Sequence, residues 1–193
     1  MIEARLRQTD AERRRCDDAR AALVQGLLDD LMRDLSGGCM ARLAVAAPTL
    51  SIYLSQPPEP DTLRLASSLH NKGWRIMVPS PGVDGKPWAQ PAWAWYGEPL
   101  MVTPRGIPVP ESFSPASLAM ADVLVMPGLA GALDGSRLGY GGGWYDRALV
   151  DASPGAQRWL LLNDSELVAD VPHDAHDQPV DLIVTPTGVH LTR

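Results

Sequence analysis

The sequence has little cysteine and no long apolar run. Its 193 residues include two cysteines, Cys16 and Cys39, which are too few for a disulfide framework or a four-thiolate zinc site. We interpret both as buried thiols in a reducing compartment, which predicts a cytoplasmic location. No apolar stretch approaches the ~20 residues that a membrane span needs, and residues 1–15 lack the apolar core of a secretory signal. We therefore expect no membrane as a partner.

Positive charge is also scarce. The chain has 17 Lys and Arg against 23 Asp and Glu, a formal net charge of −6. Broad binding to nucleic acid needs clustered positive charge, so we expect no nucleic-acid partner, whereas one local anion site stays compatible with this balance. The length is that of one domain, which usually holds about 100–200 residues. We expect residues 1–193 to form a single domain that acts as a monomer.

Proline and glycine are plentiful, with 18 and 17 residues, and they separate short apolar runs. This pattern favours many loops around a sheet. The predicted strands cover residues 49–54, 74–79, 92–96, 122–126, 159–162 and 180–184. The predicted helices cover residues 10–35, 62–72, 144–150 and a short segment near 166–169. Alternating strands and helices predict the α/β class: a mostly parallel sheet flanked by helices in a Rossmann-like three-layer architecture.

The helix over residues 10–35 is predicted from its apolar spacing. Thr9 and Glu12 fit a capping box at its start. The charge run 13–15 is interpreted as a solvated face of this helix. The predicted apolar stripe consists of Cys16, Ala19, Leu23, Leu27, Leu31 and Leu35. Further along, strand 49–54, helix 62–72 and strand 74–79 form a unit that favours parallel pairing of its two strands.

The most specific segment is residues 137–147, which follow a buried strand and open a helix. Glycines in this loop remove Cβ atoms, so backbone N–H groups can approach an anion, and the helix start adds partial positive charge. Arg137 offers a planar fork to phosphate oxygens. Asp146 lies in the first helical turn, where a carboxylate can hold a Mg²⁺ ion that bridges phosphates. The spacing fits neither the P-loop nor the dinucleotide fingerprint, and a flexible loop before a charged helix start is the plainer interpretation.

The same segment resembles the 5-formyltetrahydrofolate cyclo-ligase family, also called methenyltetrahydrofolate synthetase. The chain matches the family's PG-L-A…G-x-RLG-x-G-x-G-[FY]-YD signature over residues 127–146. Four more blocks, at residues 53–62, 73–79, 106–110 and 171–185, resemble family motifs in the same order. The resemblance implies that ATP phosphorylates the formyl oxygen of 5-formyltetrahydrofolate, with or without a polyglutamate tail. It further implies that N10 then closes the ring to give 5,10-methenyltetrahydrofolate, ADP and phosphate.

The resemblance also implies roles for individual residues. Arg137 and Tyr145 are the expected catalytic residues, and Asp146 and Asp177 the expected Mg²⁺ ligands. The expected ATP-binding residues are Arg137, Leu138, Gly139, Tyr140, Gly141, Gly142, Gly143, Trp144 and Tyr145. The expected substrate-binding residues are Tyr53, Glu59, Tyr140 and Trp144. Expected cofactors are thus Mg²⁺, with ATP as co-substrate.

Two departures from the family pattern are visible. Where the family has Ala-Phe-Asp, this sequence has Ala130-Gly131-Ala132, so the aromatic residue and the acid are missing. Asp134 is one candidate replacement for the acid. The N-terminal K-x-x-x-R has no clear counterpart, with Arg5 and Arg7 as the nearest candidates. These departures leave open a degenerate member that binds folate or nucleotide without turnover. A phosphosugar isomerase on a related scaffold is a third hypothesis, compatible with the glycine loop alone.

The segment 173–177 invites a second interpretation. His173, Asp174, His176 and Asp177 are dense enough to suggest a transition-metal site, although no cysteine lies among them. We prefer a polar loop that contributes Asp177 to a Mg²⁺ site. Asp181, which opens a predicted strand, is expected to be a structural hydrogen-bonding group or cap.

Overall fold

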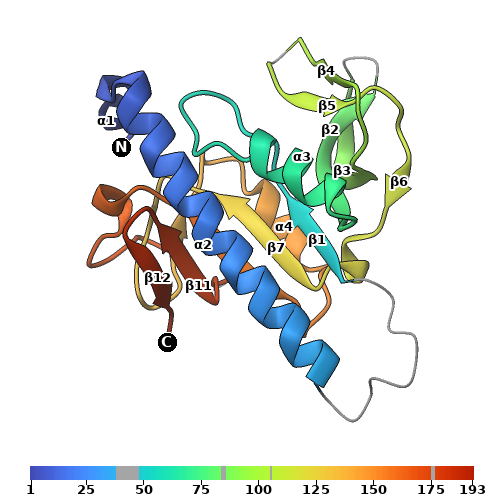
Figure 1. The fold of residues 1–193 in the computed structure, drawn as a ribbon. Coiled ribbons are helices and arrows are strands. Elements are labelled where there is room, and N and C mark those ends of the chain that lie inside the picture. The colour runs from blue at the N-terminus through green and yellow to red at the C-terminus, as the bar shows by residue number, and fades with distance from the viewer. Residues whose placement is uncertain (38–47, 84–85, 105, 175–176) are drawn as a thin grey trace.

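The computed structural model describes residues 1–37, 48–83, 86–104, 106–174 and 177–193. Its centre is an eight-stranded sheet in the order β12-β11-β10-β7-β1-β2-β3-β6. The five strands from β11 to β2 run parallel, and β12, β3 and β6 are antiparallel to their neighbours. The predicted mostly parallel α/β sheet is therefore confirmed (Figure 1).

The sheet is built from strands β1 (Thr49–Ile52), β2 (Arg75–Val83), β3 (Lys86–Trp95), β6 (Pro115–Ala116), β7 (Val123–Pro127), β10 (Gln157–Leu161), β11 (Leu182–Thr185) and β12 (Gly188–Leu191). Two small ribbons lie outside it: β4 (Leu100–Val102) pairs with β5 (Pro108–Pro110), and β8 (Ala130–Gly131) with β9 (Arg137–Leu138). The helices are α1 (Ile2–Arg7), α2 (Asp10–Gly37), α3 (Leu63–Asn71) and α4 (Trp144–Leu149), with 3-10 turns η1 (Leu118–Met120) and η2 (Asp164–Glu166).

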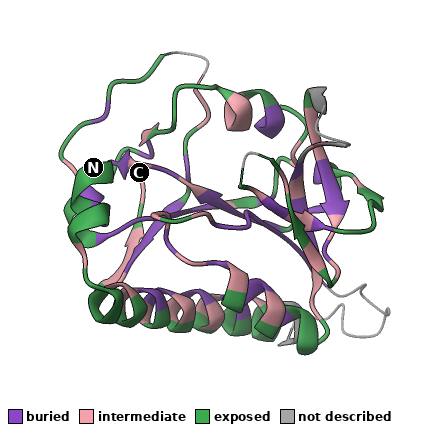
Figure 2. Cartoon of the chain, turned by 90° about the horizontal axis from the view of Figure 1, so that it is seen from above, coloured by how far each residue is buried: buried purple, intermediate pink, exposed green. Residues whose placement is uncertain are grey.

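Helices cover both faces of the sheet, because strand side chains alternate between two apolar clusters. On one face, side chains such as Ile52 and Val125 pack against Val24 and Leu28 of α2 and against α3. On the other face, side chains such as Leu124 pack against α4. Figure 2 shows the long helix along one side of the sheet, with buried residues concentrated in the central strands. The expected three layers are present.

Several local predictions are confirmed. Thr9 and Glu12 form the capping box: the Thr9 N–H donates to the Glu12 carboxylate at 2.8 Å, and the Glu12 N–H donates to Thr9 Oγ1 at 3.3 Å. Strands β1 and β2 pair in parallel, with Leu50 beside Ile76. The Asp181 carboxylate accepts the Arg158 N–H at 2.6 Å, so it is a structural group, as expected.

Other predictions need correction. The predicted stripe of α2 is confirmed in part, since its leucines at positions 23, 27 and 31 pack against the core. The fully buried centre of the face lies to one side of them, at Arg20, Val24 and Leu28. Arg20 donates hydrogen bonds to the Leu162 carbonyl and to Asn163. Cys16 is only half-buried; Cys39 lies outside the described residues.

The short helix expected near 166–169 is instead the single turn η2. It stops there because the Val168 N–H donates to the Gly131 carbonyl, which pulls the chain onto β8. The elements α1, β12 and the β4–β5 ribbon were not predicted from the sequence.

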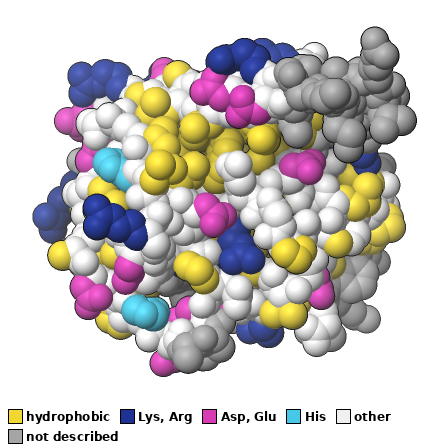
Figure 3. Space-filling view, turned by 90° about the horizontal axis from the view of Figure 1, so that it is seen from below, with side chains coloured by type: hydrophobic (Ala, Val, Ile, Leu, Met, Phe, Trp, Pro, Cys, Tyr) yellow, Lys and Arg dark blue, Asp and Glu magenta, His cyan; other side chains and the backbone are white. Residues whose placement is uncertain are grey.

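The surface mixes charges of both signs. On the face drawn in Figure 3, Lys and Arg side chains are interspersed with Asp and Glu around a group of apolar side chains. Within the described part of the chain, every helix falls short, in length or in apolar character, of what crossing a bilayer requires.

Candidate functional site

The glycine loop is open to solvent. Residues 139–143 are all exposed between β9 and α4. Gly141 and Gly143 adopt positive φ angles of 81° and 55°, which non-glycine residues rarely tolerate. A Cβ added at Gly139, Gly141 or Gly142 would meet nothing within 4 Å. The backbone of this loop is therefore accessible to a ligand.

Arg137 and Asp146 meet beneath this loop. The Arg137 Nη2 donates to Asp146 Oδ1 at 2.6 Å, and the exposed fractions of the two side chains are 6% and 21%. The Arg137 Nη1 donates to the Gln178 carbonyl, and the Gln178 N–H donates back to Asp146 Oδ1 at 3.3 Å. The expected arginine and acid therefore face one another, and Gln178, which sequence reasoning missed, links them to the next segment of the chain.

Asp177 lies next to this linkage. Its carboxylate accepts the Asp174 N–H at 2.8 Å. A cavity of about 330 Å³ is lined by Asp134, Ser136, Arg137, His173, Asp174, Asp177, Gln178 and Pro179. Asp134 thus lies beside the same cavity, although its Oδ1 already accepts the Ser136 N–H and hydroxyl.

The transition-metal interpretation finds little support here. Among the residues that the structure describes, no group of three His, Cys, Asp or Glu side chains is placed to hold a metal ion; His176 lies outside them. Two carboxylates completed by substrate phosphates are a common Mg²⁺ donor set, and Asp146 and Asp177 fit that set.

Two aromatic residues follow the loop. The Trp144 and Tyr145 rings meet edge to face at 4.9 Å, and Trp144 also packs against Trp93, at 4.9 Å between centroids. Desolvation raises the pKa of the Tyr145 phenol far above its usual range, and the nearby Glu59 charge adds to the shift. This phenol therefore stays protonated, so it can donate a hydrogen bond but cannot serve as a base.

Glu59 reaches the glycine loop from the β1–α3 connection. Its carboxylate accepts the Gln56 N–H at 2.8 Å and interacts with the Tyr140 phenol. Burial raises the pKa of the Glu59 carboxyl above its usual range. Tyr53 is buried beneath this connection, and its hydroxyl donates to the Pro60 carbonyl at 2.9 Å. The structure thus brings Glu59 and Tyr140 together, while Tyr53 supports the loop from below.

Arg5 reaches the site from α1. Its guanidinium forms two hydrogen bonds with the Glu166 carboxylate, at 2.6 and 2.8 Å, and a third with the Gly128 carbonyl at 2.6 Å. Its Nη1 lies 3.5 Å from the Tyr140 hydroxyl. By contrast, Arg7 is exposed and pairs with Glu3. Of the two N-terminal candidates, Arg5 is therefore the one that contacts the glycine loop.

The sequence offered one overlooked signal for Glu166. Asn163 and Glu166 have the spacing of a capping box, and the structure forms it. That box fixes the Glu166 carboxylate where Arg5 meets it.

The Gly131 departure has a packing explanation. A Cβ added at Gly131 would lie 2.7 Å from Leu160 Cδ2, 3.0 Å from Ile183 Cδ1 and 3.2 Å from Leu162 Cδ1. The space beside this position is therefore filled by larger core residues. The aromatic side chain of the family pattern does not fit here without their movement.

Comparison with known proteins gives one consistent result. Residues 37–186 match the model of the 5-formyltetrahydrofolate cyclo-ligase family. The chain is 30% identical to the 5-formyltetrahydrofolate cyclo-ligase of Mycolicibacterium smegmatis over 153 residues, which are 77% of this chain and 79% of that protein. It is also 30% identical to the enzyme of the same name from Escherichia coli K12 over 164 residues, 75% of this chain and 81% of that one.

Solved structures show the same fold. The chain is similar to the 5,10-methenyltetrahydrofolate synthetase of Aquifex aeolicus, with a TM-score of 0.74 and 23% identity over 100% of this chain and 89% of that one. It is similar to the Mycoplasma pneumoniae 5,10-methenyltetrahydrofolate synthetase, with a TM-score of 0.64 and 17% identity over 96% and 93% of the two chains.

Proposed function

Because the chain belongs to the 5-formyltetrahydrofolate cyclo-ligase family, we propose that it converts 5-formyltetrahydrofolate to 5,10-methenyltetrahydrofolate with ATP, releasing ADP and phosphate. The observation that carries this proposal is the Arg137–Asp146 pair beneath an open glycine loop. We include in the proposal that the enzyme works as a monomer in the cytoplasm.

The glycine loop is suited to a triphosphate. Its backbone is exposed, and the space beside Gly139, Gly141 and Gly142 is open, so N–H groups can donate to phosphate oxygens. Arg137 is held from two sides by Asp146 and Gln178. It therefore supplies a fixed positive charge at the base of the loop. Phosphoryl transfer depends mainly on such positioning and electrostatic stabilisation.

Asp146 and Asp177 are suited to hold Mg²⁺. Asp146 Oδ1 is engaged by Arg137 and by the Gln178 N–H, which orients its second oxygen as the ligand. Asp177 lines the adjacent cavity. A Mg²⁺ ion held by these two carboxylates would neutralise charge that develops on the transferred group.

The folate would bind on the other side of the loop. Glu59 and Tyr140, which interact, supply a carboxyl and a hydroxyl of the kind that hydrogen-bond a pterin. The protonated Tyr145 phenol offers a donor to the activated formyl oxygen, and the Trp144 ring supplies an apolar wall. These two roles rest on the position of both residues directly after the loop.

The decisive experiment measures formation of the methenyl chromophore by absorbance. Purified protein should give product only when 5-formyltetrahydrofolate, ATP and Mg²⁺ are all present. Product formation should stop on chelation of Mg²⁺ and resume on its return. If no product forms when protein, 5-formyltetrahydrofolate, ATP and Mg²⁺ are all present, the proposal is overturned.

One alternative has support in the structure. Gly131 lacks the family's aromatic side chain, and Arg5 is engaged by Glu166, which favours a member that binds ligands without turnover. Calorimetry with 5-formyltetrahydrofolate and ATP separately distinguishes the two: heats of binding without product would support this alternative.

A further inference from the structure

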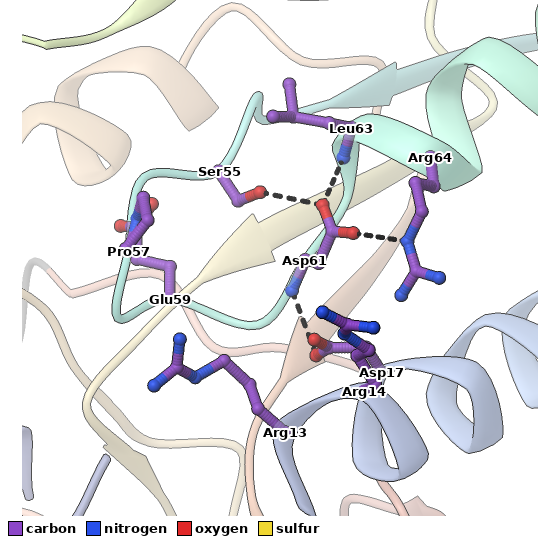
Figure 4. A pocket seen from close by; sticks show the side chains of 9 residues that line it. All are labelled: Arg13, Arg14, Asp17, Ser55, Pro57, Glu59, Asp61, Leu63 and Arg64. Atoms are coloured by element: carbon purple, nitrogen blue, oxygen red, sulfur yellow. Dashed lines mark hydrogen bonds and ion pairs between the residues drawn. The ribbon is translucent and has the colours of Figure 1, made fainter. Parts of the chain in front are cut away.

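A second cavity lies between α2 and the connection from β1 to α3. Its volume is about 420 Å³, and it is lined by Arg13, Arg14, Asp17, Ser55, Pro57, Glu59, Asp61, Leu63 and Arg64. Figure 4 shows Arg13 reaching from α2 toward the loop that carries Pro57 and Glu59. Two of the three arginines predicted to form a solvated face thus line a cavity, whereas Arg15 is exposed and is not among its lining residues.

The acidic groups near α2 are already engaged by the protein. Asp17 accepts hydrogen bonds from Arg20 and from the Asp61 N–H. Asp61 accepts the Leu63 N–H at 2.9 Å and the Arg64 Nε at 2.8 Å. Asp17 and Asp61 are therefore already paired within the fold.

Arg13 has donor capacity to spare. Its Nη1 lies 3.6 Å from Asp10, and its Nη2 makes a long hydrogen bond of 3.4 Å to the Gln8 carbonyl. Its Nε is buried and has no hydrogen-bond partner within the described part of the chain. The Arg13 side chain as a whole is 32% exposed, and its two Nη groups are only weakly engaged, so they can donate to a carboxylate in this cavity. Arg14, on the next position of the helix, adds a second guanidinium.

Glu59 connects this cavity to the proposed pterin site. It lines the cavity and also interacts with Tyr140 of the glycine loop. A ligand whose ring binds at Glu59 and Tyr140 would therefore extend its other end toward Arg13 and Arg14. In 5-formyltetrahydrofolate that end is a glutamate with two carboxylates.

We propose that Arg13 and Arg14 bind the glutamate carboxylates of the folate substrate in this cavity. This assignment rests on the proposed function, because it takes 5-formyltetrahydrofolate as the ligand. It predicts that the two arginines distinguish substrates by their tail and contribute nothing to the chemical step.

The test compares two substrates that differ only in the tail, 5-formyltetrahydrofolate and 5-formyltetrahydropteroate, which lacks the glutamate. In the variant R13Q/R14Q, the KM for the glutamylated substrate should rise about tenfold, the effect of losing about 1.4 kcal/mol of binding. Its kcat, its KM for ATP and its KM for the pteroate should stay as in the wild type. The matched control is R15Q on the same helix, which should leave all four values unchanged.

The outcomes separate this proposal from the function itself. Equal KM values for the glutamylated substrate in the wild type and R13Q/R14Q would overturn the tail site while leaving the cyclisation intact. If the wild type forms no product, calorimetric titration with the same two compounds decides. If the wild type binds 5-formyltetrahydrofolate more tightly than the pteroate and R13Q/R14Q loses that difference, the site is supported. If R13Q/R14Q keeps the difference, the site is overturned.

Discussion

Arg5 and Glu166 form a buried ion pair between residues 161 positions apart in the sequence. Both side chains are only 1% exposed. The Glu166 carboxylate raises the pKa of the Arg5 guanidinium even though burial opposes its charge. Through this pair, α1 is fastened to η2 and to the Gly128 carbonyl, next to Tyr140 of the glycine loop.

Arg5→Ala should destabilise the protein strongly. It leaves the Glu166 carboxylate buried without its cation, and breaking such a pair typically costs about 3–5 kcal/mol. Urea denaturation measures the free energy of unfolding. The control is Arg7→Ala, which removes the exposed pair with Glu3 and should change that free energy by less than about 1 kcal/mol. Similar losses in the two variants would contradict the importance of the buried pair.

Asp146→Asn should abolish most turnover while the protein stays folded. The variant loses a proposed Mg²⁺ ligand and the partner of Arg137, and the several kcal/mol that a metal contributes correspond to at least about a 100-fold lower kcat. Steady-state kinetics at a series of Mg²⁺ concentrations measure the effect. Asp151→Asn, at an exposed position after the same helix, should behave like the wild type. Wild-type turnover in D146N would remove this carboxylate from the mechanism.

Glu59 should make stability depend on pH. Burial raises the pKa of its carboxyl, so between the unfolded value of about 4.3 and the folded value the native state binds more protons. This contribution to the free energy of unfolding is present at low pH and is lost as pH rises through that interval. The wild-type free energy minus that of Glu59→Gln should therefore fall with increasing pH. Urea denaturation across that range checks this, and a difference independent of pH would refute it.

Gly135→Ala should destabilise the turn that precedes Arg137. Gly135 has a φ of +88°, and an added Cβ would lie 2.9 Å from the Val180 carbonyl oxygen. We expect overpacking to lower the free energy of unfolding by about 1–3 kcal/mol, and the strained backbone angle to lower it further. Thermal unfolding measures this destabilisation through the melting temperature. The control is Gly155→Ala, where nothing lies within 4 Å of the new Cβ. It should change the free energy of unfolding by no more than about 0.5 kcal/mol. Equal melting temperatures for the two variants would argue against this packing constraint.

The sequence predicted the framework well where periodicity or local chemistry was strong. The capping box at Thr9, the parallel pairing of the strands around helix 62–72 and the contiguous buried strand at 122–126 are all local patterns, and each is confirmed. The open loop at 139–143 was also predictable, because its cluster of glycines can be recognised directly in the sequence.

Features that depend on distant partners were not predictable. Arg5 was one of two candidates for the N-terminal basic position, but its pairing could not be predicted, since Glu166 lies 161 positions away. Arg13 and Arg14 looked like part of a solvated face, because the loop that completes their cavity comes from residues 55–64. The size of the space beside Gly131 depends on Leu160 and Ile183, which no single-residue pattern reveals.

The position of β1 in the sheet has a consequence for biosynthesis. This strand lies between β2, which follows it closely, and β7, where Leu50 is beside Val123 about 70 residues later. At roughly 5–20 residues per second, a ribosome needs roughly 4–15 s to deliver that second neighbour. During this interval one edge of the nascent sheet is unpaired and open to association with other chains. Slower translation of residues 53–122 would prolong this exposure and lower the yield of native enzyme.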